Sequence, residues 1–542
     1  MKLKLAALIG LLLAVIAGAV LLGSPYAPVV GAYREIEELW DIEDARVESE
    51  QPLVTSLTCN GIPMVYDADA NRFYCVLGLG QGSEWPEMHI TAPGEQASDL
   101  QICFADDYTY DWCNESIASG YPYLLMAYTQ TEFSYFEVVF TGLPMLSLTT
   151  DVDRNEIGAE DVPVLIDMAA ADGGISAAPG RIHRRGGATF NYDKPSFRLE
   201  FTRGANGKRK ISREVPGFGT VNSLILLACW ADTSMMHDRF SWEMYSRIAD
   251  DSEPFSACST AYVELVINGE YLGVYVALVP QNMEVELAKV GGTPTDSVYR
   301  TAFSGLARER DSVPDPLVAF SCFELYYTPV TAGHEFDALE DYFDLTAEED
   351  DEVFAQKAAS RLRMDSLLRY LLLVQAMGLT DSVDNNMTVW AHPTGGTVLY
   401  GFAPWDMDDS WGSWPDIIGE DYENWMYFPL ADRVLNLDVG GARARLAELW
   451  AQYKELGFNI ETVAEVTQGY ADELNNSGAM LRNTERWGLS SEMLDPFPVY
   501  TFASMRFARL DEVIAFIAEA EGEIGFLAAS TTKEMAGPIF FE

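Results

Sequence analysis

The stretch that decides the fold runs from Gly378 to Asp409. It follows an apolar helix that we predict from Asp365 to Gly378, and it opens with the polar loop Asp381-Ser-Val-Asp384-Asn385-Asn386. Two β-type runs, Met387 to Ala391 and Thr397 to Phe402, come next and predict a hairpin with a Gly-Gly turn. The second run leads into the acidic sequence Pro404-Trp405-Asp406-Met407-Asp408-Asp409. Apolar strands that lead into three carboxylates predict a site for a metal ion.

This order of elements is similar to the catalytic segment of protein kinases. There, a loop Asp orients the substrate hydroxyl and accepts its proton, an Asn five positions later binds magnesium, and an Asp after the hairpin holds magnesium against the phosphates. Asp381 and Asn386 have that spacing (386 − 381 = 5), and Asp406 has the place of the last Asp. Asp384 stands near the loop and is the alternative catalytic residue, although it lacks the spacing.

A basic cluster precedes this segment in a very acidic chain. The 542 residues include 35 Lys+Arg and 83 Asp+Glu, so the net charge is −48. Ten of those 35 fall between residues 181 and 213: Arg181, Arg184, Arg185, Lys194, Arg198, Arg203, Lys208, Arg209, Lys210 and Arg213. The cluster predicts an anionic ligand, and Gly186-Gly187 gives backbone N–H groups access to phosphates. We expect a nucleoside triphosphate between the cluster and the acids, bridged by magnesium. A solvent-exposed basic hairpin is the alternative.

Five pieces of sequence resemble the CotH family, the spore-coat protein H type of atypical protein kinase. They occur in the family's order between about residues 150 and 520: Arg185-Gly186 with Lys194-Pro-Ser-Phe-Arg198-Leu-Glu-Phe201, Leu226 to Ser234, Glu264 to Tyr275, Asp381 to Asn386, and Pro404 to Asp408. The resemblance implies an α+β, kinase-like body at residues 151–525, with a β-rich N-lobe and a helical C-lobe. The family's Arg-Gly loop is usually followed by Asn and serines, whereas Gly187-Ala188-Thr189 follow here.

The resemblance also implies ATP and Mg²⁺ as cofactors and assigns the site residues. Asp381 is the expected catalytic residue, and Asn386 and Asp406 are the expected metal ligands. Lys194, Arg185 and Arg198 are the expected phosphate-binding residues. Arg239 or Glu243, on a helix after Asp232, is expected to brace Lys194 or the phosphates.

The N-terminal sequence predicts export. Lys2 and Lys4 precede the uncharged apolar run Leu5 to Leu22, which has the pattern of a signal sequence and the length of a membrane span. We expect residues 1–30 to be a membrane anchor, with a cleaved signal peptide as the alternative. The rest of the chain is then at the extracellular face of the membrane or secreted. Residues 31–50 are acidic and are expected to form a solvated, partly helical stalk.

Residues 51–150 predict a small all-β module stapled by disulfides. Four cysteines, Cys59, Cys75, Cys103 and Cys113, lie within it, and after an export signal they indicate two disulfides. Three pairings are possible, and Cys59–Cys75 with Cys103–Cys113 closes the shortest loops. Zinc is the alternative, but the sequence has no C-x-x-C pair. Residues 526–542 are expected to be a C-terminal tail.

We expect an ATP- and magnesium-dependent phosphotransferase that acts on hydroxyl side chains of surface or exported proteins. A chain this acidic does not favour nucleic acid as a partner, and membrane contact is expected only through the N-terminal segment. The alternative is a non-catalytic structural or adhesive surface protein that uses the same fold. Scarcity of ATP outside cells favours this alternative, while the retained acids favour the enzyme. A glycosidase with two carboxylates explains the acids but not the basic cluster.

Overall fold

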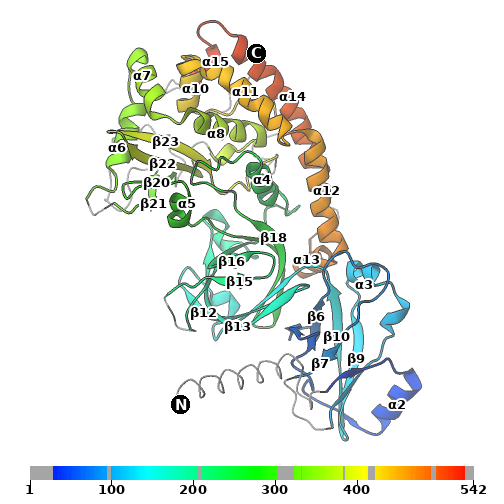
Figure 1. The fold of residues 1–542 in the computed structure, drawn as a ribbon. Coiled ribbons are helices and arrows are strands. Elements are labelled where there is room, and N and C mark those ends of the chain that lie inside the picture. Colours follow the sequence, from blue (N-terminus) through cyan, green and yellow to red (C-terminus); the bar gives the residue numbers. More distant parts are fainter. Residues whose placement is uncertain are drawn as a thin grey trace, which may run out of the picture. The chain divides into compact units, whose positions relative to one another are not determined.

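The computed structural model describes residues 28–93, 99–204, 207, 209–232, 234–301, 323–330, 333–382, 385–412, 422–489 and 496–530. The fold is α+β, as expected, with several separate sheets and many helices (Figure 1). The chain divides into two compact units. Unit 1 comprises residues 1–230, 260–279 and 471–493, and unit 2 comprises residues 231–259, 280–470 and 494–542. The predicted anchor segment Leu5 to Leu22 lies outside the described residues, and no helix within them is long and apolar enough to cross a membrane.

A closed barrel of seven strands forms the centre of unit 1. Its order is β11 (Met145–Thr149), β12 (Val162–Ala170), β13 (Gly173–Arg185), β14 (Ser196–Phe201), β17 (Ser223–Leu227), β19 (Glu270–Leu278) and β18 (Thr260–Ile267). Alternate apolar side chains fill the interior, among them the fully buried Phe197 and Leu199. The hairpin of β18 and β19 turns at Asn268-Gly269, where both residues have positive φ (52° and 80°), as a tight two-residue turn requires.

The β module also belongs to unit 1 and is not all-β. Its larger sheet has the order β1-β8-β9-β10-β6-β5, with β2 on β10, and its smaller sheet has the order β4-β3-β7. The strands are β1 (Val30–Gly31), β2 (Val47–Glu48), β3 (Thr58–Cys59), β4 (Ile62–Pro63), β5 (Val65–Asp67), β6 (Arg72–Val76), β7 (Ile90–Thr91), β8 (Gln101–Phe104), β9 (Tyr123–Tyr128) and β10 (Glu132–Thr141). Helices α2 (Ile36–Asp44) and α3 (Cys113–Ser119) accompany these sheets.

Residues 31–50 pack against the module instead of forming a solvated stalk. The expected helix is present as α2, but Leu39 and Ile42 are buried with Met126 and Phe133 in one apolar cluster. The following strand β2 pairs with β10. The acidic composition predicted an exposed stalk. It gave too little weight to Leu39 and Ile42, which are three positions apart and therefore face the same side of the helix.

The cysteines of the module lie in two different clusters. The described residues hold no disulfide, and Cys59 and Cys75 are buried thiols in contact, since a hydrogen bond between them lowers the pKa of Cys59 and raises that of Cys75. Cys113 lies in their apolar cluster, with Ile102 and Phe104 of β8. Cys103 lies between those two β8 residues and packs in the other cluster. Successive strand residues face opposite ways, so the structure brings together only the first of the two expected pairs.

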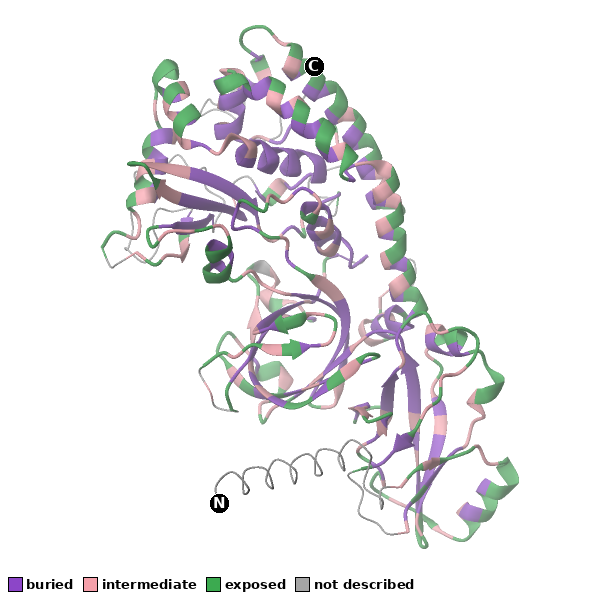
Figure 2. Cartoon of the chain, viewed as in Figure 1, coloured by how far each residue is buried: buried purple, intermediate pink, exposed green. Residues whose placement is uncertain are grey.

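A buried helix and a four-stranded sheet form the framework of unit 2. The sheet order is β21 (Phe323–Tyr327), β20 (Ser297–Thr301), β22 (Met387–Thr394) and β23 (Thr397–Pro404). Helix α8 (Met364–Met377) is buried from Ser366 onward, as Figure 2 shows. It ends at Gly378 with φ 67°, where a Cβ would lie 2.6 Å from the ring of Phe502, so glycine is needed there.

Helices make up most of the rest of unit 2. Unit 2 contains α4 (His237–Ser246), α5 (Met283–Lys289), α6 (Asp337–Thr346), α7 (Asp351–Arg361), α10 (Pro429–Asn436), α11 (Ala442–Glu455), α14 (Phe497–Glu519) and α15 (Gly525–Ser530). The boundary between the units falls within α12 (Ile460–Asn476), and α13 (Ala479–Trp487) belongs to unit 1.

Candidate active site

The polar loop of unit 2 begins where α8 ends. Asp381 lies in the short turn Thr380–Ser382, and its Oδ2 accepts hydrogen bonds from Nδ2 of Asn385 (3.1 Å) and of Asn386 (2.9 Å). Asp381 is exposed, whereas Asn386 is buried at the start of β22. The expected catalytic Asp and the expected metal-binding Asn are therefore in contact, and the carboxylate is open to solvent. Asp384, the alternative, lies outside the described residues.

The β22–β23 hairpin places the acidic loop beside the polar loop. Met387 pairs with Pro404, and the Trp405 N–H donates to the Asn386 carbonyl at 2.9 Å, so Asp406 follows directly on this contact. Asn386, Asp406 and Trp411 all have left-handed backbone conformations (φ 56°, 52° and 53°). Such strain persists only where the surroundings enforce it, and it gathers at functional sites.

The acidic loop is fixed to helices α4 and α8. The indole N–H of Trp411 donates to Ser241 Oγ of α4 at 2.9 Å, and the two hydroxyls of Ser241 and Ser410 are 3.0 Å apart. The Trp411 backbone N–H donates to the Met377 carbonyl at 2.6 Å. Thr380 Oγ1 in turn bonds to the Asp409 carboxylate, which links the acidic loop to the polar loop. These contacts hold the polar loop before the β22–β23 hairpin and the acidic loop after it in one arrangement.

Carboxylates crowd each other at this loop. Desolvation and the charges of Asp406, Asp238 and Asp409 raise the pKa of Asp408 well above its ordinary value, although Asp408 keeps accessible surface. Asp238 is buried in the first turn of α4, at 4% exposure. Sequence reasoning missed Asp238, which lies among several polar residues in the first turn of α4 and carries no distinctive local pattern. A divalent cation would relieve this repulsion.

The donor set fits magnesium better than a softer metal. It consists of carboxylate oxygens and the Asn386 amide, whose Nδ2 donates to Asp381 and whose Oδ1 is left to bind a cation. Within the described ranges, no group of three or more His, Cys, Asp or Glu could hold a metal ion, so the site expected from the three carboxylates Asp406, Asp408 and Asp409 alone is not present. Magnesium commonly takes one or two protein carboxylates and completes its shell with water and phosphate oxygens.

Arg300 of β20 is a second residue that sequence reasoning missed. Its buried guanidinium lies 3.7 Å from the ring centre of Tyr326 and 4.0 Å from that of Trp405. Burial lowers the pKa of Arg300, and the charges of Tyr326, Glu324 and Asp406 oppose that shift. A positive charge therefore lies beside the acidic loop and holds the Trp405 ring.

Lys194, in unit 1, is buried among neutral groups. Its side chain is 2% exposed, and its amine donates to the Val274 carbonyl and to Asn483 Oδ1 (3.0 Å). The same nitrogen lies 4.7 Å from the ring centre of Tyr275. Burial lowers the pKa of Lys194 to about 7. An anionic ligand would supply the negative charge that this amine lacks.

Strand register places the expected arginines on the face that does not line the barrel interior. Arg185 pairs with Ser196, and Arg198 pairs with His183, while their neighbours Phe197 and Leu199 fill the barrel. Glu200 is almost fully buried on that face and takes up three cations: Arg181 (Nε–Oε2 2.6 Å), Arg198 (Nε–Oε1 3.2 Å) and Lys210. Arg198 is therefore held by Glu200 and shares that carboxylate with two other cations, and Arg185 is half-buried at the end of β13.

Arg184, the neighbour of the expected phosphate-binding residue Arg185, lies on the opposite face of β13. It lies on the interior face of β13 and donates to the Tyr192 carbonyl at 2.6 Å, with its guanidinium 5.4 Å from the Phe190 ring centre. Its Nε is buried without a hydrogen-bond partner among the described residues. Burial lowers the pKa of Arg184, and its charge acts on Tyr275, the residue beneath Lys194.

The expected brace for Lys194 is replaced by another residue. Arg239 packs 4.2 Å from the ring centre of Tyr470, and Glu243 pairs with Arg247 at 2.9 Å, all within unit 2. Asn483 of α13 holds the lysine instead. The two residues are 289 positions apart in the chain, so no local motif could have connected them.

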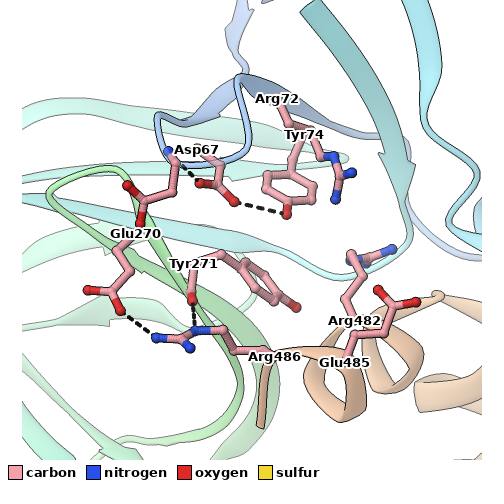
Figure 3. Close-up of a pocket in the computed structure, with 9 residues that line it drawn as sticks. Asp67, Arg72, Tyr74, Glu270, Tyr271, Arg482, Glu485 and Arg486 are labelled. Atoms are coloured by element: carbon pink, nitrogen blue, oxygen red, sulfur yellow. Dashed lines mark hydrogen bonds and ion pairs between the residues drawn. The ribbon is translucent and has the colours of Figure 1, made fainter. Parts of the chain in front are cut away.

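A polar pocket of about 400 Å³ lies elsewhere in unit 1 (Figure 3). It is lined by Asp67, Asp69, Arg72, Tyr74, Glu270, Tyr271, Arg482, Glu485 and Arg486, and none of the expected site residues is among them. The Tyr74 and Tyr271 rings stack at 5.4 Å, and Arg486 bonds to Glu270 and to the Tyr271 carbonyl. Because its arginines are paired with acids, we assign the pocket to the packing of α13 in unit 1.

A profile of the family described as "CotH kinase protein" matches residues 182–515, more than half of the chain. The chain belongs to the CotH family. The match contains both the Asp381–Asn386–Asp406 arrangement of unit 2 and the Lys194 environment of unit 1, so the family predicted from sequence is confirmed. No curated protein matches the chain significantly.

Proposed function

We propose that this CotH protein transfers phosphate from ATP to hydroxyl side chains of surface or exported proteins. The observation that carries the proposal is the hydrogen-bonded contact of Asp381 with Asn386, next to the strand end that carries Asp406. Family membership supports kinase-type chemistry. The class of protein substrate rests on the export signal that the N-terminal sequence predicts.

Each residue has a distinct role in this proposal. Asp381 orients the attacking hydroxyl and accepts its proton, while the amides of Asn385 and Asn386 hold its carboxylate. Asn386 and Asp406 hold magnesium, which when bound neutralises charge on the phosphate oxygens. Lys194 contributes positive charge to the phosphates, and Arg184 is better oriented than Arg185 or Arg198 to assist it.

The test compares Asp406→Asn with Asp251→Asn, a matched change at an exposed turn of unit 2. The full chain is used because the β module and the barrel belong to one compact unit. With magnesium, γ-labelled ATP and an extract of exported proteins, wild type and Asp251→Asn should transfer label. Asp406→Asn should lose about 100-fold or more, because the charged ligand of the magnesium that offsets phosphate charge is removed. Equal transfer by both variants would refute the proposal.

The non-catalytic alternative has one observation in its favour. Tyr110 and Trp112 of the β module are 86% and 59% exposed. Asp111 between them turns inward to accept a hydrogen bond from the Tyr123 hydroxyl at 2.8 Å, so the two rings point outward. Exposed aromatic side chains are typical of interaction surfaces. A wild-type chain that neither transfers label nor is stabilised by magnesium and ADP would leave this adhesive function as the conclusion.

A further inference from the structure

Asn483 joins Lys194 to the wall of the barrel. Its Oδ1 accepts two hydrogen bonds at 3.0 Å, one from the Lys194 amine and one from the Val274 backbone N–H. The Lys194 amine also donates to the Val274 carbonyl, so lysine, amide and strand form a closed set of contacts. Asn483 is 1% exposed, and its position is therefore fixed by packing.

Gly273 makes room for this amide in β19. A Cβ at residue 273 would lie 2.3 Å from Asn483 Oδ1 and 3.2 Å from its Cγ. Its φ of +83° is a second reason for glycine. The glycine therefore admits a side chain from α13 to the backbone next to Tyr275, on which the lysine amine packs.

The helix that carries Asn483 is anchored by a buried ion pair one residue earlier. Arg482 Nε donates to Glu264 Oε1 at 2.9 Å, and its NH2 donates to Oε2 at 2.8 Å. Thr141 and Tyr271 also donate to this carboxylate, at 2.6 Å and 2.5 Å. A network that uses both carboxylate oxygens fixes α13 against β18 and β19.

We propose that Asn483 is a positioning residue for Lys194, which holds the amine with an uncharged group and leaves the ammonium charge for a nucleotide phosphate. The identity of the ligand rests on the proposed function, but the placement of the lysine does not. A carboxylate at residue 483 would instead pair with the ammonium, as Glu264 pairs with Arg482.

The surroundings of Lys194 agree with this role. The titratable and charged groups near it include Cys229 after β17, Tyr275 on β19, and three arginines whose charges act on Tyr275: Arg154, Arg184 and Arg486. Glu270 pairs with Arg154 and Arg486, and within the described part of the chain the Lys194 amine has no ion pair with a carboxylate. Burial holds the pKa of Lys194 near 7, so binding of an anion near neutral pH is accompanied by proton uptake at the amine.

The experiment replaces the neutral partner by a charged one. Asn483→Asp is compared with Asn476→Asp, an exposed change on α12 that adds the same charge. The first readout is thermal stability of the full chain from pH 6 to pH 9 without ligand. Lys194→Met supplies the reference curve without the amine. Wild type should gain stability over this reference as pH rises above about 7, and Asn483→Asp should lose that gain because the aspartate keeps the lysine protonated.

The second readout is the Kd for ADP with magnesium. Asn483→Asp should weaken it about tenfold or more, because the aspartate occupies the ammonium. Gly273→Ala should also weaken it, by displacing Asn483 without adding charge. The proposal would be overturned if Asn483→Asp and Gly273→Ala both matched Asn476→Asp, in the pH dependence of stability and in the Kd for ADP. A wild type that binds no ADP would refute the proposed function alone, and the ligand-free pH curves would still decide the role of Asn483.

Discussion

Two buried cations of unit 1 meet at neighbouring positions of helix α13, and one has a charged partner whereas the other has neutral partners. Arg482 of α13 is itself the cation and pairs with the buried carboxylate of Glu264. Lys194 contacts the next residue, Asn483, and has only neutral partners. Burial disfavours both charges, but Glu264 raises the pKa of Arg482, whereas the pKa of Lys194 is lowered to about 7. A paired buried charge maintains the fold, and a buried charge among neutral groups is available for a ligand.

The largest expected effect is on the paired cation. Arg482→Met leaves Glu264 buried and uncompensated, so the free energy of unfolding should fall by about 3–5 kcal/mol. Arg486→Met removes a half-buried arginine from the same helix and should lower it by about 1 kcal/mol or less. Chemical denaturation of the two variants checks this. An equal fall in the free energy of unfolding for both variants would mean that the buried Arg482–Glu264 pair stabilises the fold no more than a half-buried pair.

The packing of the buried cysteines also determines which disulfide we expect. We propose that Cys59 and Cys75 are oxidised to a disulfide by a thiol oxidase during export, and that Cys103 is not joined to Cys113. The bond would close a loop of 17 residues (75 − 59 + 1) and stabilise the module by about 3 kcal/mol. Mass spectrometry of unreduced peptides from exported protein should show the Cys59–Cys75 cross-link. A Cys103–Cys113 cross-link would contradict the arrangement of the two clusters.

The pH dependence of the free energy of unfolding should also distinguish Lys194 from Arg482. The pKa of Lys194 is about 7 in the folded chain and about 10.4 when unfolded, so the unfolded state binds more protons between these values. Stability of wild type relative to Lys194→Met should therefore rise with pH above about 7, by about 1.4 kcal/mol per pH unit at most. Denaturation at pH 7, 8 and 9 measures the slope. A flat or falling difference would show that the lysine is charged in the folded protein.

The smallest effect is expected at Arg198, one of three cations that share the Glu200 carboxylate. Arg198→Ala removes one of three cations from Glu200 and should change stability by less than about 1 kcal/mol and ADP affinity little. Arg184→Ala should weaken ADP binding more, because the Nε of Arg184 lacks a partner among the described residues. Titration of ADP into both variants ranks them. The reverse ranking would restore Arg198 as the phosphate-binding residue.

Local patterns predicted the framework of the site. The buried helix α8 and the β22–β23 hairpin both follow from patterns within 50 residues, where the chain has few alternatives, whereas the contact of Asp381 with Asn386 was found only in the structure. Asn483 was not predictable because its contact with Lys194 spans 289 positions. Arg184 was not distinguished from Arg185 because the end of β13 carries polar side chains on both faces, so alternation could not fix which one points inward.

The most direct test of this comparison is Lys194→Met, with melting temperature and stabilisation by magnesium and ADP measured side by side at pH 7.5. If the lysine is kept for a ligand, the variant should melt at or above the wild-type temperature and lose the ADP-induced rise, because an expensive buried amine and a phosphate contact are removed together. A variant that melts as early as Arg482→Met and keeps the full ADP-induced rise would show that Lys194 is a structural cation and would contradict the account.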